Sequence, residues 1–379
     1  QGVACDFVDA RQLIKTDNNF GTANVDIPKT YERLADYFKN NRNLSLMGGF
    51  IASTTEGITT TLGRGGSDYT ASLAGAALDA SVIEIWTDVD GVLTADPRKV
   101  ANAFPLEKIS YEEAGELAHF GAKVIHPKTM KPARLKGIPI LIKNTFNPGA
   151  KGTLISQEKT KQDFPIKGIS SLYYVSLLQI QSHDGRNIAE IATKVFDALS
   201  RANIEILLIT QASHEPSLSV AFHNQYSQKA KTALEQAFSW ELKAQQMPPL
   251  NLEDNLVIIA IVGQEMKGVP GISGKFLSTL GNNKINIVAI AQGSSELNVS
   301  AVINAQDETK ALQAVHQAFF GFKGEPLNLF MVGTGLIGST LLKQMQTEGS
   351  ALRLCGLANS RFQLLDKAGI DIKQWDQKL

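Results

Sequence analysis

Two glycine-rich segments of the chain carry residue types that bind charged ligands. Residues 62–68 read Leu-Gly-Arg-Gly-Gly-Ser-Asp, and residues 333–338 read Gly-Thr-Gly-Leu-Ile-Gly. Glycines let backbone N–H groups approach an anion, Arg64 can pair with a carboxylate through two hydrogen bonds, and Asp68 can orient an amine or a magnesium ion. The first segment therefore predicts a ligand site. The alternative is a surface turn capped by Ser67 or Asp68.

A second group of charged residues follows a β-branched run at 81–86. Thr-Asp-Val-Asp-Gly at 87–91 comes directly after this predicted strand, where open α/β sheets place their ligand-binding loops. Asp-Pro-Arg at 96–98 follows closely. Asp88 near a ribose or a metal-bound water, with Arg98 near the base or phosphates, would fit a nucleotide. The alternative is an Asp-Gly turn with solvated charges.

A third motif, Phe-Gly-Ala-Lys-Val-Ile-His-Pro at 120–127, ends a predicted helix with a glycine. Lys123 lies just beyond that glycine and could contact a phosphate, although lone lysines are usually solvated. His126 precedes a proline and is expected to be structural rather than catalytic.

The segment at 333–338 lies in the context of a dinucleotide-binding fingerprint. It follows a predicted strand at 328–332, opens a periodic helix at 336–345, and a second strand is predicted at 352–357. Asn-Ser-Arg at 359–361 stands where an acidic residue would bind the ribose 2′-hydroxyl of NAD, which favours NADP. The alternative is a glycine motif that serves helix packing alone. The predicted cofactor contacts are Gly333, Gly335, Leu336, Ile337, Gly338, Asn359, Ser360 and Arg361.

The elements that must position these residues alternate between strand and helix. A strand from residue 44 leads into a Gly-Gly turn, and helices are predicted at 69–80 and 111–120 with strands at 81–86 and 138–142. This alternation predicts an α/β layer with a parallel or mixed sheet.

An internal repeat with an offset of 81 residues follows a predicted linker at 156–163. Each copy reads as an amphipathic helix, a short turn, an Ile-rich strand, a Gln-x-Ser-x-Glu turn and another strand, which predicts two similar α+β modules. Residues 324–326 then break the second module from the next strand. The repeated positions are Lys194, Ile204, Ile206, Ile209, Gln211, Ser213, Glu215 and Ser219, matched by Lys275, Ile285, Ile287, Ile290, Gln292, Ser294, Glu296 and Ser300.

Composition limits the classes of function. The chain has 379 residues, which predicts two or three domains. Basic and acidic residues both number 37, so no global field recruits nucleic acid or an anionic membrane. Cys5 and Cys355 give no disulfide framework, and the longest apolar run, 256–262, is too short to span a membrane. We therefore expect small-molecule partners and a reducing, cytoplasmic location, or a plastid in a plant.

Four sequence motifs resemble those of the amino-acid kinase family and specifically of the aspartokinases. They lie at residues 61–69, 85–91, 94–98 and 120–127. The resemblance implies that L-aspartate binds at Arg64, Ser67 and Asp68. It implies an ATP site, with Mg²⁺ accompanying ATP, lined by Thr87, Asp88, Arg98, Lys123 and Val124. Leu93 departs from the tyrosine of many relatives. The family's N-terminal Lys-Phe-Gly-Gly strand and its upstream glutamate do not occur, so we expect no measurable kinase turnover from this chain alone.

The repeated modules resemble ACT domains, the amino-acid-sensing units of aspartokinases. Their Gln-containing motifs are similar to the effector-binding motifs of threonine-sensitive enzymes. This resemblance implies that Gln211 and Gln292 bind threonine and that Asn298 supports its binding. The alternative is that these glutamines only cap turns. One copy is commonly inserted into the other in this family, which predicts a complete second copy and a divided first copy. ACT modules also imply a homo-oligomer.

Residues 332–338 and 356–361 resemble the start of homoserine dehydrogenase as fused to aspartokinase. The predicted fold class is α/β. It comprises the C-terminal part of a kinase domain (an α/β/α sandwich, 1–158), a tandem ACT region (164–324) and the first β-α-β unit of an NAD(P)-binding Rossmann domain (326–379). The resemblance predicts a segment of a threonine-regulated enzyme that makes aspartyl phosphate and uses NADPH (or NADH), in threonine, methionine and lysine biosynthesis. The alternatives are a monofunctional aspartokinase and an amino-acid-binding regulatory module without catalysis.

Overall fold

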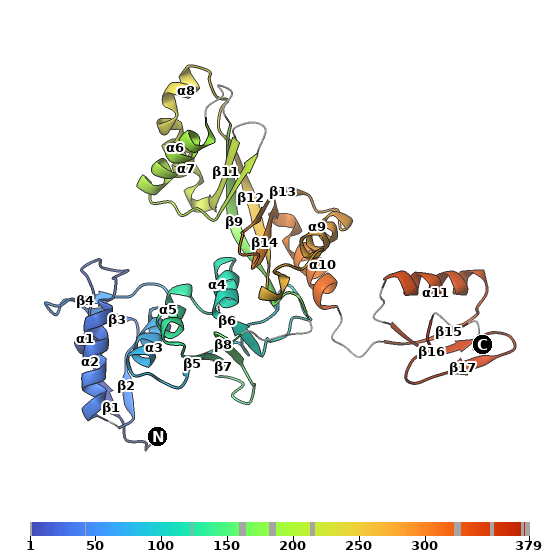
Figure 1. The fold of residues 1–379 in the computed structure, drawn as a ribbon, viewed down its shortest axis with the longest axis horizontal. Coiled ribbons are helices and arrows are strands. Elements are labelled where there is room, and N and C mark those ends of the chain that lie inside the picture. The colour runs from blue at the N-terminus through green and yellow to red at the C-terminus, as the bar shows by residue number, and fades with distance from the viewer. Residues whose placement is uncertain are drawn as a thin grey trace. The chain divides into compact units, whose positions relative to one another are not determined.

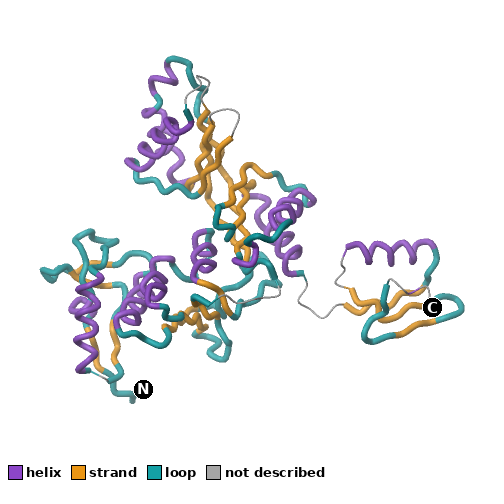
Figure 2. Tube along the Cα trace, viewed as in Figure 1, coloured by secondary structure: helices purple, strands orange, loops and turns teal. Residues whose placement is uncertain are grey.

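Short strands and helices alternate through the N-terminal part of the chain, as the sequence predicts (Figures 1 and 2). The computed structural model describes residues 2–41, 43–122, 124–158, 164–181, 187–212, 217–321, 327–348, 352–372 and 375. These residues form two compact units, Gln1–His316 and Gln317–Leu379. No helix in the described segments is long and apolar enough to cross a bilayer.

The kinase-like part of the larger unit is built on a four-stranded mixed sheet in the order β5-β7-β8-β6. Strands β5 and β7 pair in parallel, and their buried isoleucines pack with α4 and α5 into one apolar core. Helix α3 packs against α2, α5 and β5. The elements are β1 (Asp6–Val8), α1 (Ala10–Leu13), α2 (Ile27–Asn40), β2 (Ser45–Met47), β3 (Ile51–Ser53), β4 (Thr59–Thr61), α3 (Gly66–Ala77), β5 (Ile83–Thr87), β6 (Lys108–Ser110), α4 (Tyr111–His119), α5 (Pro127–Lys136), β7 (Ile140–Asn144) and β8 (Thr153–Ser156).

Helix α3 begins three residues earlier than the sequence predicts. Gly65 precedes it in a left-handed conformation with φ +70°, which a glycine adopts without steric cost. No side chain caps the helix, so the alternative of a turn capped by Ser67 or Asp68 is wrong. Both residues instead lie in the first helical turn, where backbone N–H groups and the helix dipole favour an anion.

The regulatory part of the larger unit is one six-stranded antiparallel sheet in the order β10-β11-β9-β12-β14-β13. Strands β10 and β13 at opposite edges contact each other, so the sheet curls around an apolar interior. Helices α6, α7 and α8 cover the first module. The elements are β9 (Gly168–Gln181), α6 (Ile188–Arg201), β10 (Leu208–Ala212), β11 (Ser217–His223), η1 (Asn224–Tyr226), α7 (Ser227–Ala237), α8 (Ser239–Lys243), β12 (Asn251–Val262), η2 (Gln264–Met266), α9 (Ile272–Asn282), β13 (Ile287–Gln292), β14 (Asn298–Asn304), η3 (Ala305–Asp307) and α10 (Glu308–Phe320).

The two modules repeat each other in register, as the 81-residue offset predicts. Gln211 pairs with Leu218, and Gln292 pairs with Val299 at the same position of the second module. The prediction of a divided first copy is wrong, because the start of β9 belongs to the second module. In this segment Ile169 pairs with Ile261. The second module is therefore the divided one, and the first is inserted into it.

Strands β9 and β12 bend where the two modules meet. Their pairing shifts register on either side of Leu256, and Tyr174 and Asn255 near this point have φ of 61° and 59°. A left-handed backbone is uncommon for asparagine and strained for a residue as bulky as tyrosine. The junction therefore stores backbone strain at Tyr174.

We expect Tyr174→Gly to be more stable than Tyr174→Ala by about 1 kcal/mol. The left-handed conformation costs an L-residue roughly 1–2 kcal/mol, and part of this gain is offset because glycine has the more flexible unfolded chain. Urea unfolding of the two variants measures the difference. Tyr173, whose φ is not positive, is the matched control, and there the glycine variant should be the less stable. Equal stability of the two Tyr174 variants would contradict the strain.

The smaller unit is a β-α-β arrangement with one additional strand. Strands β15 (Leu327–Val332) and β16 (Leu352–Ala358) pair in parallel, and α11 (Leu336–Glu348) connects them. The sequence predicts these three elements but not β17 (Gln363–Leu365), which pairs antiparallel with β16. Leu342 and Met345 of α11 pack on Leu354 and Leu357 of β16.

Candidate active site

Two adjoining cavities lie where the kinase-like part meets the regulatory sheet. The smaller cavity, of about 370 Å³, is lined by the loops after β5, the end of α4, strand β9 and helix α10. The larger cavity, of about 720 Å³, is lined by the start of α3, the 118–127 segment, β9 and the first regulatory module. The two cavities share Gly121, Ala122, Val124 and Tyr173.

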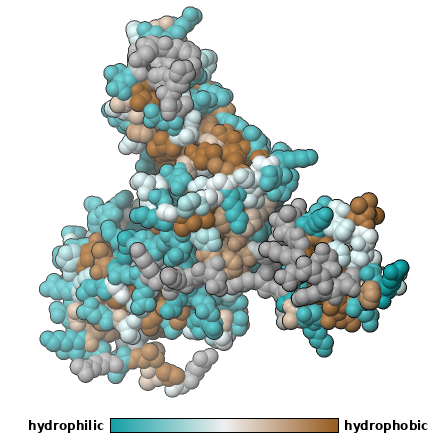
Figure 3. Space-filling view, turned by 45° about the vertical axis from the view of Figure 1, so that its right-hand side comes forward, coloured by the Kyte–Doolittle hydropathy of each residue, from teal (hydrophilic) through white to brown (hydrophobic). Residues whose placement is uncertain are grey.

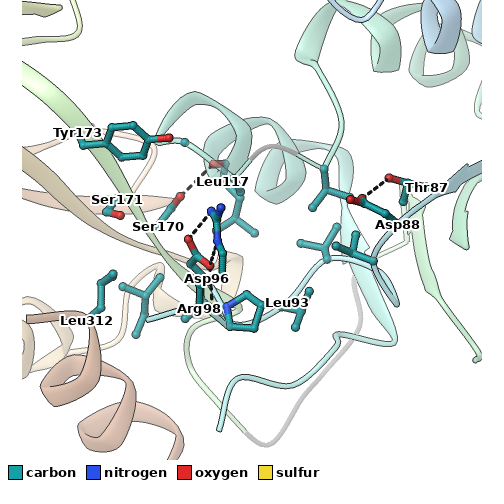
Figure 4. Close-up of a pocket in the computed structure, with 18 residues that line it drawn as sticks. Thr87, Asp88, Leu93, Asp96, Arg98, Leu117, Ser170, Ser171, Tyr173 and Leu312 are labelled. Atoms are coloured by element: carbon teal, nitrogen blue, oxygen red, sulfur yellow. Dashed lines mark hydrogen bonds and ion pairs between the residues drawn. The ribbon is translucent and has the colours of Figure 1, made fainter. Parts of the chain in front are cut away.

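The smaller cavity collects four of the five predicted nucleotide residues: Thr87, Asp88, Arg98 and Val124. The fifth, Lys123, lies outside the described residues. Figure 4 shows Thr87 beside Asp88, and the Thr87 hydroxyl donates to Asp88 Oδ1 at 3.1 Å. The parallel pairing of β5 with β7 places these residues at the carboxyl edge of the sheet.

Arg98 lies at the rim of the smaller cavity, with its side chain 81% exposed. Its guanidinium donates to Asp96 through Nε at 3.0 Å and Nη2 at 2.8 Å, and this pairing lowers the pKa of Asp96. Because the Arg98 side chain is exposed to water, its ion pair with Asp96 contributes little free energy. Arg98 can therefore leave Asp96 for a ligand anion at little cost. The Arg98 guanidinium thus lies at the mouth of the cavity, paired with Asp96.

The regulatory region forms one wall of the smaller cavity, which the sequence motifs do not indicate. Ile169, Ser170, Ser171 and Tyr173 come from β9, and Leu312 comes from α10 (Figure 4). The Ser170 hydroxyl donates to the carbonyl of Phe120 at 2.8 Å and ties β9 to the end of α4. No local sequence motif predicts that these residues line the cavity, because only the tertiary fold brings them to the loops after β5.

Helix α10 is also bound to the loop that carries Arg98. Lys99 Nζ lies 2.5 Å from Glu308 Oε1, and Gln313 Nε2 donates to the carbonyl of Lys99 at 2.9 Å. Within the same interface, Thr94 Oγ1 lies 2.9 Å from Nε2 of the buried His316. A shift of α10 must therefore move this loop.

The buried His316 predicts a pH-dependent stability. Burial lowers the pKa of His316, so the unfolded chain takes up the proton first as the pH falls through about 6.5. The stability from neutral His316 is present above this pH and is lost below it, by at most about 1.4 kcal/mol between pH 7.5 and 5.5. Urea unfolding at several pH values should show a shallower pH slope for His316→Gln. An unchanged slope would contradict the assignment.

The larger cavity brings together Arg64 and Asp68 but not Ser67. Burial raises the pKa of Asp68, because the carboxylate loses contact with water. A ligand ammonium group at this position would restore the charged form. Ser67 is exposed, and its backbone packs closely against Gly49. A Cβ added to Gly49 would lie 2.8 Å from the Ser67 Cα.

His126 lines the larger cavity and has the structural role that the sequence predicts. Its Nδ1 accepts a hydrogen bond from Lys128 N at 3.1 Å and so caps α5. Burial, followed by the charge of Arg64, lowers the pKa of His126. The first regulatory module contributes Glu205, Leu207 and His223 to the same cavity, and the sequence gives no sign of these contacts.

The three predicted effector residues lie in different surroundings. Gln211 and Gln292 are exposed near the ends of β10 and β13, and the Ser273 hydroxyl donates to Gln292 Oε1 at 3.0 Å. Asn298 Nδ2 donates to Glu116 Oε2 of α4 at 2.7 Å, so this amide links the second module to the kinase-like part. Residues 213–216, with part of the first Gln-x-Ser-x-Glu turn, lie outside the described residues.

The smaller unit brings both halves of the dinucleotide motif to one edge of its sheet. Gly333, with φ +100°, donates its N–H to the carbonyl of Ala358 at 2.8 Å. A Cβ on Gly338 would lie 2.1 Å from the Gly333 oxygen, so only glycine permits this close approach. Asn359 Oδ1 accepts from Arg361 N at 2.8 Å and closes the turn after β16. Gly335, Leu336, Ile337 and Ser360 complete the predicted set at this edge.

Two family models match parts of this chain. The model of the amino acid kinase family matches residues 1–144, and that of the ACT domain matches residues 180–238 and 259–319. A bifunctional aspartokinase/homoserine dehydrogenase of Haemophilus influenzae is 39% identical over 386 residues, which cover all of this chain and 47% of the relative. The match covers all of this chain, but the chain spans only about half the length of this curated relative.

Two solved structures are similar over most of the chain. Aspartokinase III of Escherichia coli in complex with aspartate and ADP is 34% identical, with a TM-score of 0.71, and the match covers 84% of this chain and 70% of that one. The aspartate kinase of Clostridium acetobutylicum is 31% identical with a TM-score of 0.73, covering 83% and 71% of the two chains. Both likenesses confirm the predicted kinase and ACT folds.

Proposed function

Because this chain belongs to the aspartokinase family, we propose that the complete enzyme transfers a phosphoryl group from ATP to L-aspartate. The smaller cavity holds the nucleotide, and Arg98 and Thr87 contact its polar groups. The larger cavity holds aspartate, with Arg64 paired to a carboxylate and Asp68 to the ammonium group. The aspartate side-chain carboxylate attacks the γ-phosphorus, and ADP leaves.

The wall shared by the two cavities is the observation that supports this proposal. An in-line phosphoryl transfer requires the acceptor and the nucleotide to meet at one point, and catalysis depends mainly on position and charge. Here Gly121, Ala122 and Val124 border both cavities. Within the described residues no cluster of three His, Cys, Asp or Glu side chains is placed to hold a metal. Mg²⁺ at nucleotide sites is commonly bound through the substrate phosphates and one or two carboxylates, so we infer that it enters with ATP.

Calorimetry on the 379-residue chain tests the assignment of the cavities. MgADP and L-aspartate should each bind, and D-aspartate should bind more weakly because Arg64 and Asp68 fix two substituents of one chiral centre. Binding of neither ligand would overturn the proposal.

We further propose that the smaller unit binds the ADP portion of NADPH for a dehydrogenase function of the complete protein. The pyrophosphate would lie at the start of α11, against Gly333, Gly335, Leu336, Ile337 and Gly338, and the 2′-phosphate would face Asn359, Ser360 and Arg361. The cofactor would supply the hydride, and these residues would orient it. Tighter binding of 2′,5′-ADP than of 5′-ADP would support the preference for NADP, and the reverse order would overturn it.

For the regulatory modules, we propose amino-acid sensing by threonine and self-association. Gln211 and Gln292 occupy equivalent positions, and near them Ile209 and Ile290 are 46% and 44% exposed on edge strands. Apolar side chains gather on the lobe that holds the regulatory sheet (Figure 3), which suits an oligomer contact. Calorimetry with threonine, lysine and methionine separates the effectors, and binding of none would overturn sensing. An effector acts only by binding two states unequally.

A further inference from the structure

Tyr173 has a position that no motif indicates. Four described residues border both cavities, and the other three are Gly121, Ala122 and Val124. Tyr173 is thus the member of the shared wall whose side chain carries a hydrogen-bonding group. It comes from β9, a strand of the regulatory sheet, whereas the other three residues follow the end of α4 in the sequence.

Neighbouring charges and rings hold the Tyr173 side chain in place. Lys99 Nζ lies 5.3 Å from the centroid of the Tyr173 ring, and Glu308 fixes the lysine at 2.5 Å. The Tyr174 ring meets Tyr173 edge-on at a centroid distance of 5.0 Å. In Figure 4 the hydroxyl end of Tyr173 points toward the helix that carries Leu117. A side chain fixed in this way loses little entropy when it binds a ligand.

We propose that the Tyr173 hydroxyl donates a hydrogen bond to the γ-phosphate of bound ATP. The inference rests on the proposed kinase function, because it requires ATP in the smaller cavity and the phosphoryl acceptor in the larger one. The γ-phosphate is then the part of ATP that reaches the shared wall. A phenolic hydroxyl donates well to a phosphate oxygen, and such charge-assisted bonds are stronger than neutral ones.

This contact gives the regulatory sheet a direct role in nucleotide recognition. Tyr173 follows the segment of β9 that pairs with the second module and precedes the segment that pairs with β11 of the first module. Movement of one module relative to the other therefore displaces the hydroxyl from the γ-phosphate position. Nucleotides that lack this phosphate are not affected by the displacement.

Calorimetry of the 379-residue chain with the magnesium complexes of ADP and of a non-hydrolysable ATP analogue tests the inference. We expect Tyr173→Phe to weaken the triphosphate about tenfold, as for one hydrogen bond to a charged group, and to leave ADP within twofold. Phenylalanine keeps the ring over Lys99, and an unchanged melting temperature establishes that the fold is intact. The matched control is Tyr37→Phe, which removes a phenolic hydroxyl from α2, away from both cavities.

The outcomes distinguish failure of the γ-phosphate contact from failure of the proposed function. Equal weakening of both nucleotides would overturn the γ-phosphate contact, since the hydroxyl would then serve another part of the ligand. Unchanged affinity for both would also overturn it while leaving the proposed function intact. If the unmutated chain bound neither nucleotide, the assignment of the smaller cavity would fail, and the inference would fail with it.

Discussion

Replacement of Gly121 by alanine is expected to abolish nucleotide binding and to lower the stability of the larger unit by about 3 kcal/mol. Gly121 has φ +106°, and an alanine Cβ would lie 2.3 Å from the backbone oxygen of Ser171. The clash is with the backbone of β9. This backbone is hydrogen-bonded to β12, so it cannot move away as a flexible side chain could. Relief requires the end of α4 to separate from β9, and this opens the wall between the two cavities.

Helix α4 offers a matched control for this substitution. Gly115 lies within α4, six residues before Gly121, and a Cβ there would meet no atom within 4 Å. Gly115→Ala should raise stability by roughly 0.5–1 kcal/mol, because alanine is the better helix former. Urea unfolding and calorimetry with MgADP measure the two effects. If Gly121→Ala were as stable as Gly115→Ala, the close approach of α4 to β9 would be contradicted.

Replacement of Arg64 by alanine is expected to weaken L-aspartate binding about a hundredfold. A bidentate pair between a guanidinium and a carboxylate contributes two charge-assisted hydrogen bonds, each stronger than a neutral one. Arg64 is exposed at the larger cavity, so its removal leaves no buried charge behind and the fold should stay intact. Arg64→Lys keeps the charge without the fork, and we expect an intermediate loss.

The control for Arg64 is another exposed arginine that lies outside both cavities. Arg201 on α6 pairs with Asp197 at 3.0 Å, and its side chain is 80% exposed. Arg201→Ala should therefore bind aspartate as the unmutated chain does. Calorimetry gives the affinities, and melting temperatures check the fold. An Arg64→Ala chain that bound aspartate within twofold of the unmutated affinity would rule out the carboxylate pairing.

Local patterns predicted those parts of the fold and site that depend on contiguous residues. The strand before Thr87 and the glycines around Arg64 and Gly333 are such cases, since backbone conformation and the edge of a parallel sheet follow from local sequence. The equivalent positions of Gln211 and Gln292 followed from the repeat alone. These predictions required no knowledge of how distant elements pack.

The remaining features depend on contacts between distant segments. Tyr173, Glu205 and Leu312 reach the cavities from the regulatory region, and no spacing relates them to the loops after β5. Asn298 carries a side chain suited to an effector, but its amide is engaged by Glu116 of another element. The division of the second module was also missed, because the start of β9 reads as an ordinary strand until its pairing partner is known.

The insertion of one regulatory module into the other sets an order on folding during synthesis. The start of β9 leaves the ribosome first, and its partner in β12 follows only after the whole first module has been made. Pairing across such a sequence distance carries a loop-closure cost, which a folded first module reduces by bringing the ends of its own segment together. A ribosome that stalls before β12 would leave backbone N–H and C=O groups at the start of β9 unpaired, and such strand edges recruit other chains. Quality control during translation should therefore recognise this interval of the nascent chain.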